Sequence, residues 1–100
     1  MTKWSALPRD CEMMFITKPD IESLDDIIYK LVAVIENNGG RVLNLDKWGK
    51  KRLGYEMQGY EDGLYVLVTF ASSGKALVEL DRVVKLTDEV LRHMIIRKGE

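Results

Sequence analysis

The sequence predicts an α+β fold in which a strand, a helix, two strands, a second helix and a last strand follow one another. Two stretches whose apolar residues recur at three- and four-residue spacing predict the helices. Runs rich in apolar and β-branched residues, separated by Gly-, Pro- and Asp-containing turns, predict the strands. Right-handed crossovers then place both helices on one face of a four-stranded antiparallel sheet. The expected architecture is the ferredoxin-like split βαβ (βαββαβ), whose second sheet face is open to water or a partner.

The first part of the chain supplies a strand and a helix. Residues 12–17 form a short apolar run that stops before a turn, as a buried strand does. Pro19 and Asp20 suit the start of a helix, and Ser23 is a second capping candidate. The apolar positions that follow have helical spacing: Leu24, Ile27, Ile28, Leu31, Val34 and Ile35. The Asn-Asn-Gly-Gly sequence at 37–40 ends this helix, because Asn and Gly accept the left-handed C-cap conformation.

The second part of the chain supplies a hairpin, a helix and an edge strand. Residues 41–57 are extended, residues 59–63 hold two glycines and two acids and predict a turn, and residues 64–70 are the strongest strand prediction. A helix opens at residues 72–74 and buries Leu77, Leu80 and Val84, with Ala76 and Val83 beside them. Residues 90–97 then alternate. One face of this strand carries Arg92, Met94 and Ile96, and the other carries Leu91, His93 and Ile95.

Composition bounds the class of protein. One hundred residues with 46% apolar and 31% charged side chains make one globular domain. The 15 Lys and Arg residues nearly balance 16 Asp and Glu residues, which leaves a formal net charge of −1. Any affinity for nucleic acid must therefore come from segregated charge, because the chain has no general positive field.

Other features argue for a reducing compartment. The single cysteine, Cys11, excludes an intrachain disulfide and a Cys-rich zinc site. The longest apolar run, residues 31–35, is too short to span a bilayer. Residues 1–10 contain no apolar core of signal-peptide length. We therefore expect a soluble cytoplasmic protein.

The sequence offers no chemistry for catalysis. The only histidine, His93, lies on the last strand, where a structural or surface role is the more common one. The acidic pairs at 25–26, 61–62 and 88–89 are neighbours in helix starts and turns, which caps and turn residues explain. No Gly-rich phosphate loop with its lysine is present. We predict no catalytic residue, no metal site, no cofactor, no small-molecule substrate and no membrane partner.

The most informative feature is the basic segment, residues 48–55 (WGKKRLGY). Three consecutive cations, Lys50, Lys51 and Arg52, stand between two glycines and are flanked by Trp48 and Tyr55. Cations bind phosphate, aromatic rings stack on bases, and glycines let a backbone approach closely, which are the parts needed to grip RNA. The alternative is an amphipathic strand whose basic face is only solvated.

Five segments, taken together and in order, resemble the bacterial small-subunit ribosomal protein six family. They are residues 12–20, 37–40, 48–56, 63–67 and 80–82 with 85–95, and the basic segment resembles that family's motif of Gly, two basic residues, Leu, a small residue and Tyr. The resemblance covers about 11–98, so we expect an arm at 1–10, a single ribosomal-protein-six-like domain at 11–98 and a tail at 99–100. One departure is Cys11, where the family usually has Tyr.

The resemblance implies a structural role without enzyme activity. Members bind the central domain of small-subunit ribosomal RNA as a heterodimer with small-subunit ribosomal protein eighteen, which implies a place in the cytoplasmic ribosome. The candidate RNA- or partner-binding residues are Trp48, Lys50, Lys51, Arg52, Tyr55, Arg92, His93, Arg97 and Lys98. Docking of the partner needs an apolar patch beside the cations, and Trp48, Tyr55 and Met94 are candidates for it.

Two alternatives stay open at this point. A ferredoxin-like small-molecule-sensing or enzymatic domain has the same fold, and a concave pocket with converging polar groups would identify it. A plastid or mitochondrial member of the same family is the second. The sequence assigns no role to the arm or to Trp4 within it, and does not identify the RNA nucleotides or the oligomeric state.

Overall fold

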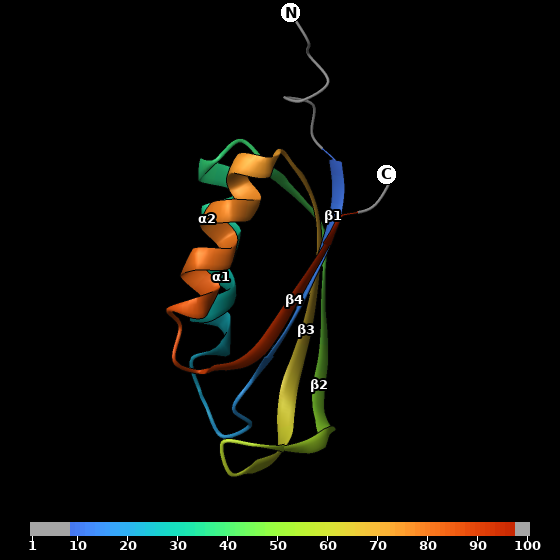
Figure 1. The fold of residues 1–100 in the computed structure, drawn as a ribbon, viewed down its shortest axis with the longest axis vertical. Coiled ribbons are helices and arrows are strands. Elements are labelled where there is room, and N and C mark those ends of the chain that lie inside the picture. The colour runs from blue at the N-terminus through green and yellow to red at the C-terminus, as the bar shows by residue number, and fades with distance from the viewer. Residues whose placement is uncertain (1–8, 98–100) are drawn as a thin grey trace, which may run out of the picture.

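The structure is a computed structural model that describes residues 9–97. Within them the elements follow the predicted order: β1 (Arg9–Thr17), α1 (Leu24–Asn37), β2 (Arg41–Met57), β3 (Tyr60–Ser72), α2 (Gly74–Lys85) and β4 (Val90–Arg97). The strands form one antiparallel sheet in the order β2-β3-β1-β4, and both helices lie against the same face of it (Figure 1). The predicted fold class is confirmed.

Helix α1 ends as the sequence predicts. Gly39 has a φ of 87°, and its amide donates to the carbonyl of Glu36 at 3.1 Å. The next amide, that of Gly40, donates to the carbonyl of Ile35 at 2.8 Å. This pair of bonds is the Schellman motif, which needs a left-handed residue just past the helix and therefore favours glycine there.

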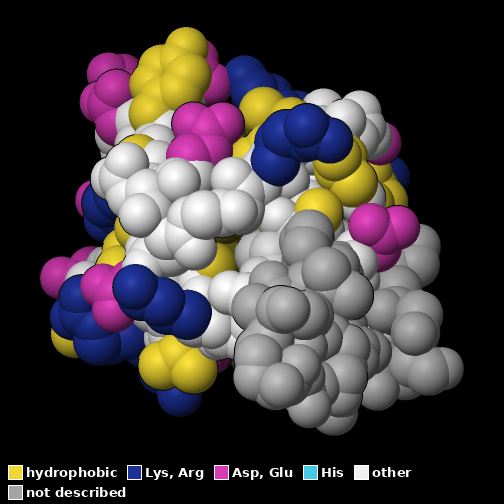
Figure 2. Space-filling model, turned by 90° about the horizontal axis from the view of Figure 1, so that it is seen from above, with side chains coloured by type: hydrophobic (Ala, Val, Ile, Leu, Met, Phe, Trp, Pro, Cys, Tyr) yellow, Lys and Arg dark blue, Asp and Glu magenta, His cyan; other side chains and the backbone are white. Residues whose placement is uncertain are grey.

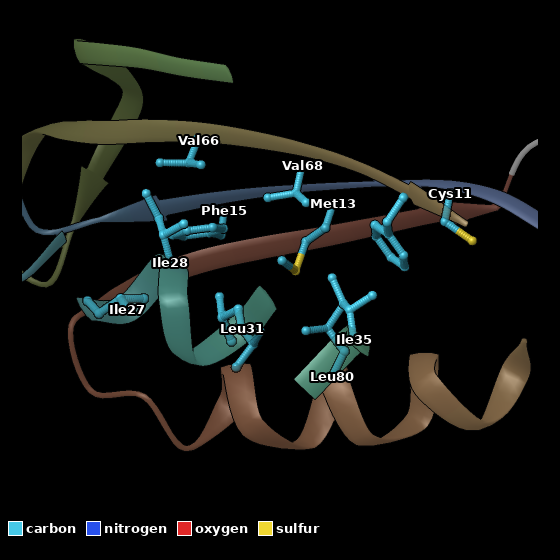
Figure 3. Close-up of a cluster of buried hydrophobic side chains, with 12 residues drawn as sticks. Cys11, Met13, Phe15, Ile27, Ile28, Leu31, Ile35, Val66, Val68 and Leu80 are labelled. Atoms are coloured by element: carbon cyan, nitrogen blue, oxygen red, sulfur yellow. The ribbon is translucent and has the colours of Figure 1, made fainter. Parts of the chain in front are cut away.

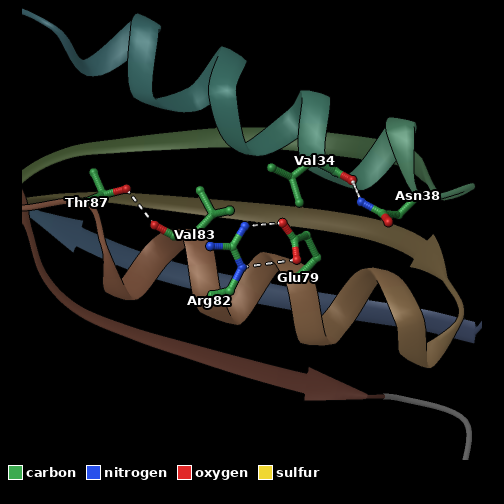
Figure 4. Close-up of polar contacts among 6 residues, drawn as sticks. All are labelled: Val34, Asn38, Glu79, Arg82, Val83 and Thr87. Atoms are coloured by element: carbon green, nitrogen blue, oxygen red, sulfur yellow. Dashed lines mark hydrogen bonds and ion pairs between the residues drawn. The ribbon is translucent and has the colours of Figure 1, made fainter.

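Side chains close the C-terminal ends of both helices (Figure 4). The side-chain amide of Asn38 donates to the backbone carbonyl of Val34, and the side-chain hydroxyl of Thr87 donates to the backbone carbonyl of Val83, each at 2.8 Å. Both carbonyls belong to a last helical turn, where backbone acceptors lack an intrahelical partner. In the described part of the chain, neither helix combines the length and the apolar character needed to cross a membrane.

The core fills the space between the two helices and one face of the sheet (Figure 3). Its members are Cys11, Met13 and Phe15 of β1, Val66, Val68 and Phe70 of β3, Ile27, Ile28, Leu31 and Ile35 of α1, and Leu80 and Val84 of α2. None of these side chains is more than 4% exposed. Because alternate residues of a strand point to opposite faces, the intervening residues must lie on the other side of the sheet.

That other side, which we call the helix-free face, carries side chains of every strand. The central strands contribute Glu12, Met14 and Ile16 of β1 with Tyr65, Leu67 and Thr69 of β3. Strand β4 contributes Arg92, Met94 and Ile96, which lie opposite the β1 residues Ile16, Met14 and Glu12. The alternation predicted for the last strand is thus confirmed.

The turn between β2 and β3 is tighter than the sequence predicts. We expected residues 59–63 to turn and the strand to begin at Leu64, but the chain reverses at Gln58 and Gly59 and β3 begins at Tyr60. Both turn residues have positive φ, 50° and 85°, as the inner residues of a type I′ hairpin turn do. Gly63 therefore belongs to a strand, where its missing side chain makes room for packing.

Gly63 lets two side chains pack over the backbone of β3. A Cβ at this position would lie 2.5 Å from Cγ2 of Ile16, 3.0 Å from the carbonyl oxygen of Thr17 and 3.3 Å from Cδ2 of Leu53. Leu53 turns inward here because residues 53–56 of β2 oppose little of β3, whose pairing passes from Arg52 with Asp62 to Met57 with Tyr60. Leu53 is only 8% exposed, although its neighbours on the hairpin are in water.

Replacing Gly63 with alanine should destabilise the protein. The added methyl group overlaps Ile16 and the backbone at Thr17, and overpacking of this kind costs about 1–3 kcal/mol in the free energy of unfolding. Urea denaturation at neutral pH measures it. Gly54→Ala is the matched control, since a Cβ at Gly54 meets nothing within 4 Å. Equal losses from both variants would contradict the packing role of Gly63.

Candidate nucleic-acid and protein interface

The three cations of the basic segment lie on β2, an outer strand of the sheet, and all are exposed. Lys50, Lys51 and Arg52 pair with Leu64, Gly63 and Asp62 of β3. Since Gly63 faces the helix-free side, Lys51 projects there, and its two neighbours project to the opposite side. The hairpin extends past the ends of both helices, so neither face is covered at its tip (Figure 1).

The charges of the basic segment are unpaired within the described residues. No ion pair there includes Lys50, Lys51 or Arg52. The neighbouring Lys47 contrasts with them, because its ammonium group lies 2.6 Å from the carboxylate of Asp25 on α1. The segment therefore presents positive charge to solvent, whereas Lys47 ties β2 to a helix.

A bulge in β2 places Trp48 on the helix-free face. Lys47 pairs with Val66 and Gly49 with Tyr65, so Trp48 is an extra residue between them. Gly49 takes a φ of 84°, which an L side chain rarely adopts. The indole Nε1 donates to Oδ2 of Asp46 at 3.1 Å, and the ring is 43% exposed.

A shallow hollow of about 220 Å³ occupies the middle of the helix-free face. All four strands contribute to its lining, which consists of Glu12, Met14, Trp48, Leu67, Met94 and Ile96. Met94 and Ile96 are each 50% exposed. Exposed apolar side chains gathered in this way indicate a surface that another molecule covers. Of the predicted docking residues, the structure brings Trp48 and Met94 together here.

Tyr55 and Arg92 meet at the hairpin end of the same face. Nη1 of Arg92 donates to the hydroxyl of Tyr55 at 3.1 Å, although the two residues come from the two outer strands of the sheet. The phenol ring of Tyr55 is 64% exposed. Arg97 is exposed, but it pairs with Cys11 towards the other end of β4. Lys98 lies outside the described residues, and so do Trp4 and the rest of 1–8.

His93 does not lie with Arg92. It pairs with Phe15 and therefore faces the helices, where its Nε2 is 2.7 Å from Oδ1 of Asp81 on α2. Its side chain is only 18% exposed. Asp81 also forms an ion pair with Lys85, at 2.9 Å. His93 thus joins β4 to α2, on the face of the sheet opposite to the one that carries Arg92.

Four residues that line the hollow are not among the predicted site residues: Glu12, Met14, Leu67 and Ile96. A signal for the apolar ones was present. Residues 13–16 and 64–68 are apolar at both alternating positions, which is typical of strands covered on both faces. Two helices cover only one face, so the second apolar set had to remain available to a partner.

Comparison with known proteins identifies the family. The model of the ribosomal protein S6 family matches residues 11–97. The chain belongs to the ribosomal protein S6 family. It is 46% identical over 94 residues to small ribosomal subunit protein bS6 of Desulforamulus reducens, covering 92% of this chain and 99% of the relative. Against the bS6 protein of Clostridium acetobutylicum it is 44% identical over 87 residues, covering 85% and 92%.

The fold agrees with this family. The crystal structure of 30S ribosomal protein S6 from Thermotoga maritima superposes with a TM-score of 0.86 at 26% identity, covering 91% of this chain and 88% of that one. As a member of the S6 family, the protein is a structural, non-enzymatic constituent of the small ribosomal subunit and associates with ribosomal RNA. Its place is the cytoplasmic ribosome. The enzymatic alternative is thereby excluded.

Acid should weaken the contact between α2 and β4. The pKa of Asp81 is lowered because its carboxylate accepts hydrogen bonds from Lys85 and then from His93. A lowered pKa in the folded state means that these bonds contribute stability above the unfolded-state pKa of about 3.9, and that this contribution is lost as pH falls through the folded-state pKa.

We therefore expect Asp81→Asn to be less stable than wild type at neutral pH and the difference to shrink below about pH 4. Urea denaturation between acidic and neutral pH checks this. Asp88→Asn removes the same charge from an exposed turn and should have little effect throughout. A gap between wild type and Asp81→Asn that persists unchanged into strong acid would contradict the assignment.

Proposed function

We propose that the protein binds the central domain of small-subunit ribosomal RNA together with small-subunit ribosomal protein eighteen, using the helix-free face and the hairpin end of β2. The observation that carries the proposal is an exposed apolar hollow on the face that the helices leave uncovered, next to a hairpin whose three cations form no ion pair within the described residues. The hollow is suited to a protein, and the cations are suited to RNA.

The hollow has the composition of a protein-binding site. Apolar side chains form nearly all of its lining, and an indole, a thioether and a branched alkyl group are half exposed at it: Trp48, Met94 and Ile96. Large aromatic and flexible sulfur-containing side chains are enriched at the centre of protein interfaces. Protein eighteen is the partner we propose for this hollow.

The cations supply the RNA contacts. Lys50, Lys51 and Arg52 are exposed and unpaired in the described structure, and each cation that neutralises a phosphate adds affinity that falls with salt. At the end of the molecule opposite the hairpin turn, Lys and Arg side chains are interspersed with Asp and Glu (Figure 2). The cations of the hairpin therefore form a local site on a chain of net charge −1.

The hollow of the helix-free face gives no support to the small-molecule alternative. Such a domain needs polar groups that converge in a concave pocket. In the hollow, Glu12 is the one lining residue with a charged side chain, and the rest of the lining is apolar.

The proposal is tested by measuring binding of a central-domain RNA fragment with and without protein eighteen. We expect tight, partner-dependent binding at moderate salt. If RNA binds equally well with and without protein eighteen, the proposed heterodimer is wrong. If no RNA binding is seen with protein eighteen present, the proposed RNA site is wrong as well.

Met94→Glu should weaken association with protein eighteen at least tenfold, because a carboxylate in an apolar hollow must be desolvated without a partner. Met94 is half exposed, so the fold should tolerate the change. Calorimetric titration of protein eighteen measures the affinity. Val78→Glu is the matched control, since Val78 is an apolar residue of α2 that is 73% exposed. Equal affinities for the two variants would argue against docking at the hollow.

The double variant Lys50→Ala with Arg52→Ala should weaken RNA binding and flatten its salt dependence. Losing two phosphate contacts lowers the slope of log affinity against log salt by about 1.4 to 1.8. Filter binding at several salt concentrations, with protein eighteen present, gives the slope. The control is a double variant in which alanine replaces two exposed lysines of the helices, Lys30 and Lys75. An unchanged slope in the first variant would show that these cations do not bind phosphate.

A further inference from the structure

Tyr55 and Arg92 form a bridge between the two outer strands of the sheet. Strands β2 and β4 are separated by β3 and β1, yet the guanidinium of Arg92 donates to the hydroxyl of Tyr55 at 3.1 Å. A straight β2 would keep Tyr55 at its own edge. The bridge therefore requires that the end of β2 leave the plane of the sheet.

The bulge at residues 53–56 provides this path, and Leu53 fixes it. Leu53 and Ile16 both pack against Gly63, where the missing side chain makes room for them. Ile16 is the residue of β1 that pairs directly with Arg92. The anchor of the bulge thus lies by Gly63, near the β1 residue that pairs with Arg92, and Tyr55, two residues beyond Leu53, reaches the guanidinium group.

The chemistry of the bridge leaves the charge of Arg92 intact. A carboxylate would pair with the guanidinium and cancel its field, but a phenol hydroxyl accepts a hydrogen bond and remains neutral. In the described structure no carboxylate forms an ion pair with Arg92. One of its five N–H donors is used, so the others remain for an anion of fork-like geometry, such as phosphate.

We infer that Tyr55 is a positioning residue for RNA: its hydroxyl holds the Arg92 guanidinium on the helix-free face, oriented to bind a backbone phosphate alongside Lys51. Lys51 projects from the same face, opposite Gly63. Long, exposed arginine side chains lose rotamer entropy on binding, and a group that is already held loses less. This inference rests on the proposed RNA binding and assigns to it a residue that itself carries no charge.

A double-mutant cycle tests the inference. Affinities for central-domain RNA are measured at several salt concentrations, with protein eighteen present, for wild type, Tyr55→Phe, Arg92→Gln and the double variant. We expect Arg92→Gln to reduce the salt slope by about 0.7 to 0.9, the share of one phosphate contact. Tyr55→Phe should weaken binding about three- to tenfold in the wild-type background and hardly at all in the Arg92→Gln background.

The control is Tyr29→Phe, which removes a hydroxyl from an α1 residue that is 70% exposed and should change nothing. Equal effects of Tyr55→Phe in both backgrounds would mean that the hydroxyl acts independently of Arg92 and would overturn the inference. So would wild-type affinity in Tyr55→Phe. If the variants lose affinity only for protein eighteen, measured without RNA, then Arg92 contacts the partner protein. That result would overturn the phosphate role.

A readout without RNA separates this inference from the proposed function. In the free protein, NMR relaxation of the Arg92 Nε–Hε group should show a more mobile guanidinium in Tyr55→Phe than in wild type. Equal mobility in the two proteins would overturn the positioning role whatever the RNA measurements give. Failure of wild type to bind RNA would instead overturn the proposed function, and the phosphate role of Arg92 with it.

Discussion

Two helices cover only one face of a four-stranded sheet whose central strands are apolar on both faces. The core side of β1 holds Met13 and Phe15, and the other side holds Met14 and Ile16. A sheet with this pattern is stable in water only where both faces are shielded, or where the uncovered apolar area is small and serves an interface. The hollow and the hairpin end of the helix-free face are thus consequences of where the crossovers put the helices.

The missing side chain at Gly63 controls how the hairpin ends. With room for Leu53 beside Ile16, the end of β2 bends over the sheet, where a regular antiparallel ladder would continue flat. Bulges commonly re-aim side chains at sheet edges near functional sites. Here the bulge brings Tyr55 to Arg92, so a packing detail near the start of β3 determines which charged groups share a surface.

Patterns local in the chain predicted most of the fold. The Asn-Asn-Gly-Gly end of α1 and the alternation of β4 are confirmed because caps and strand faces depend on neighbouring residues. The site could be predicted only in part. The basic segment is contiguous, but the hollow joins four strands, and which of His93 and Arg92 faces a helix depends on which face α2 covers. The turn was predicted at residues 59–63 but lies at residues 58–59. Glycine is typical of turns, but Gly63 lies within β3, where its missing side chain is needed for packing.

The described cations fall into two groups by partner. Those that join elements or brace a helix pair with carboxylates, as Lys47 does with Asp25, and Lys85 with Asp81. Those at the hairpin end have no carboxylate partner, and Arg92 has a neutral one. In the proposed function, cations without ion pairs at one end of the molecule let a chain of net charge −1 bind a polyanion there without a general attraction for nucleic acid. Specificity then depends on keeping those few cations in place, and for Arg92 the neutral hydroxyl of Tyr55 does this without cancelling its charge.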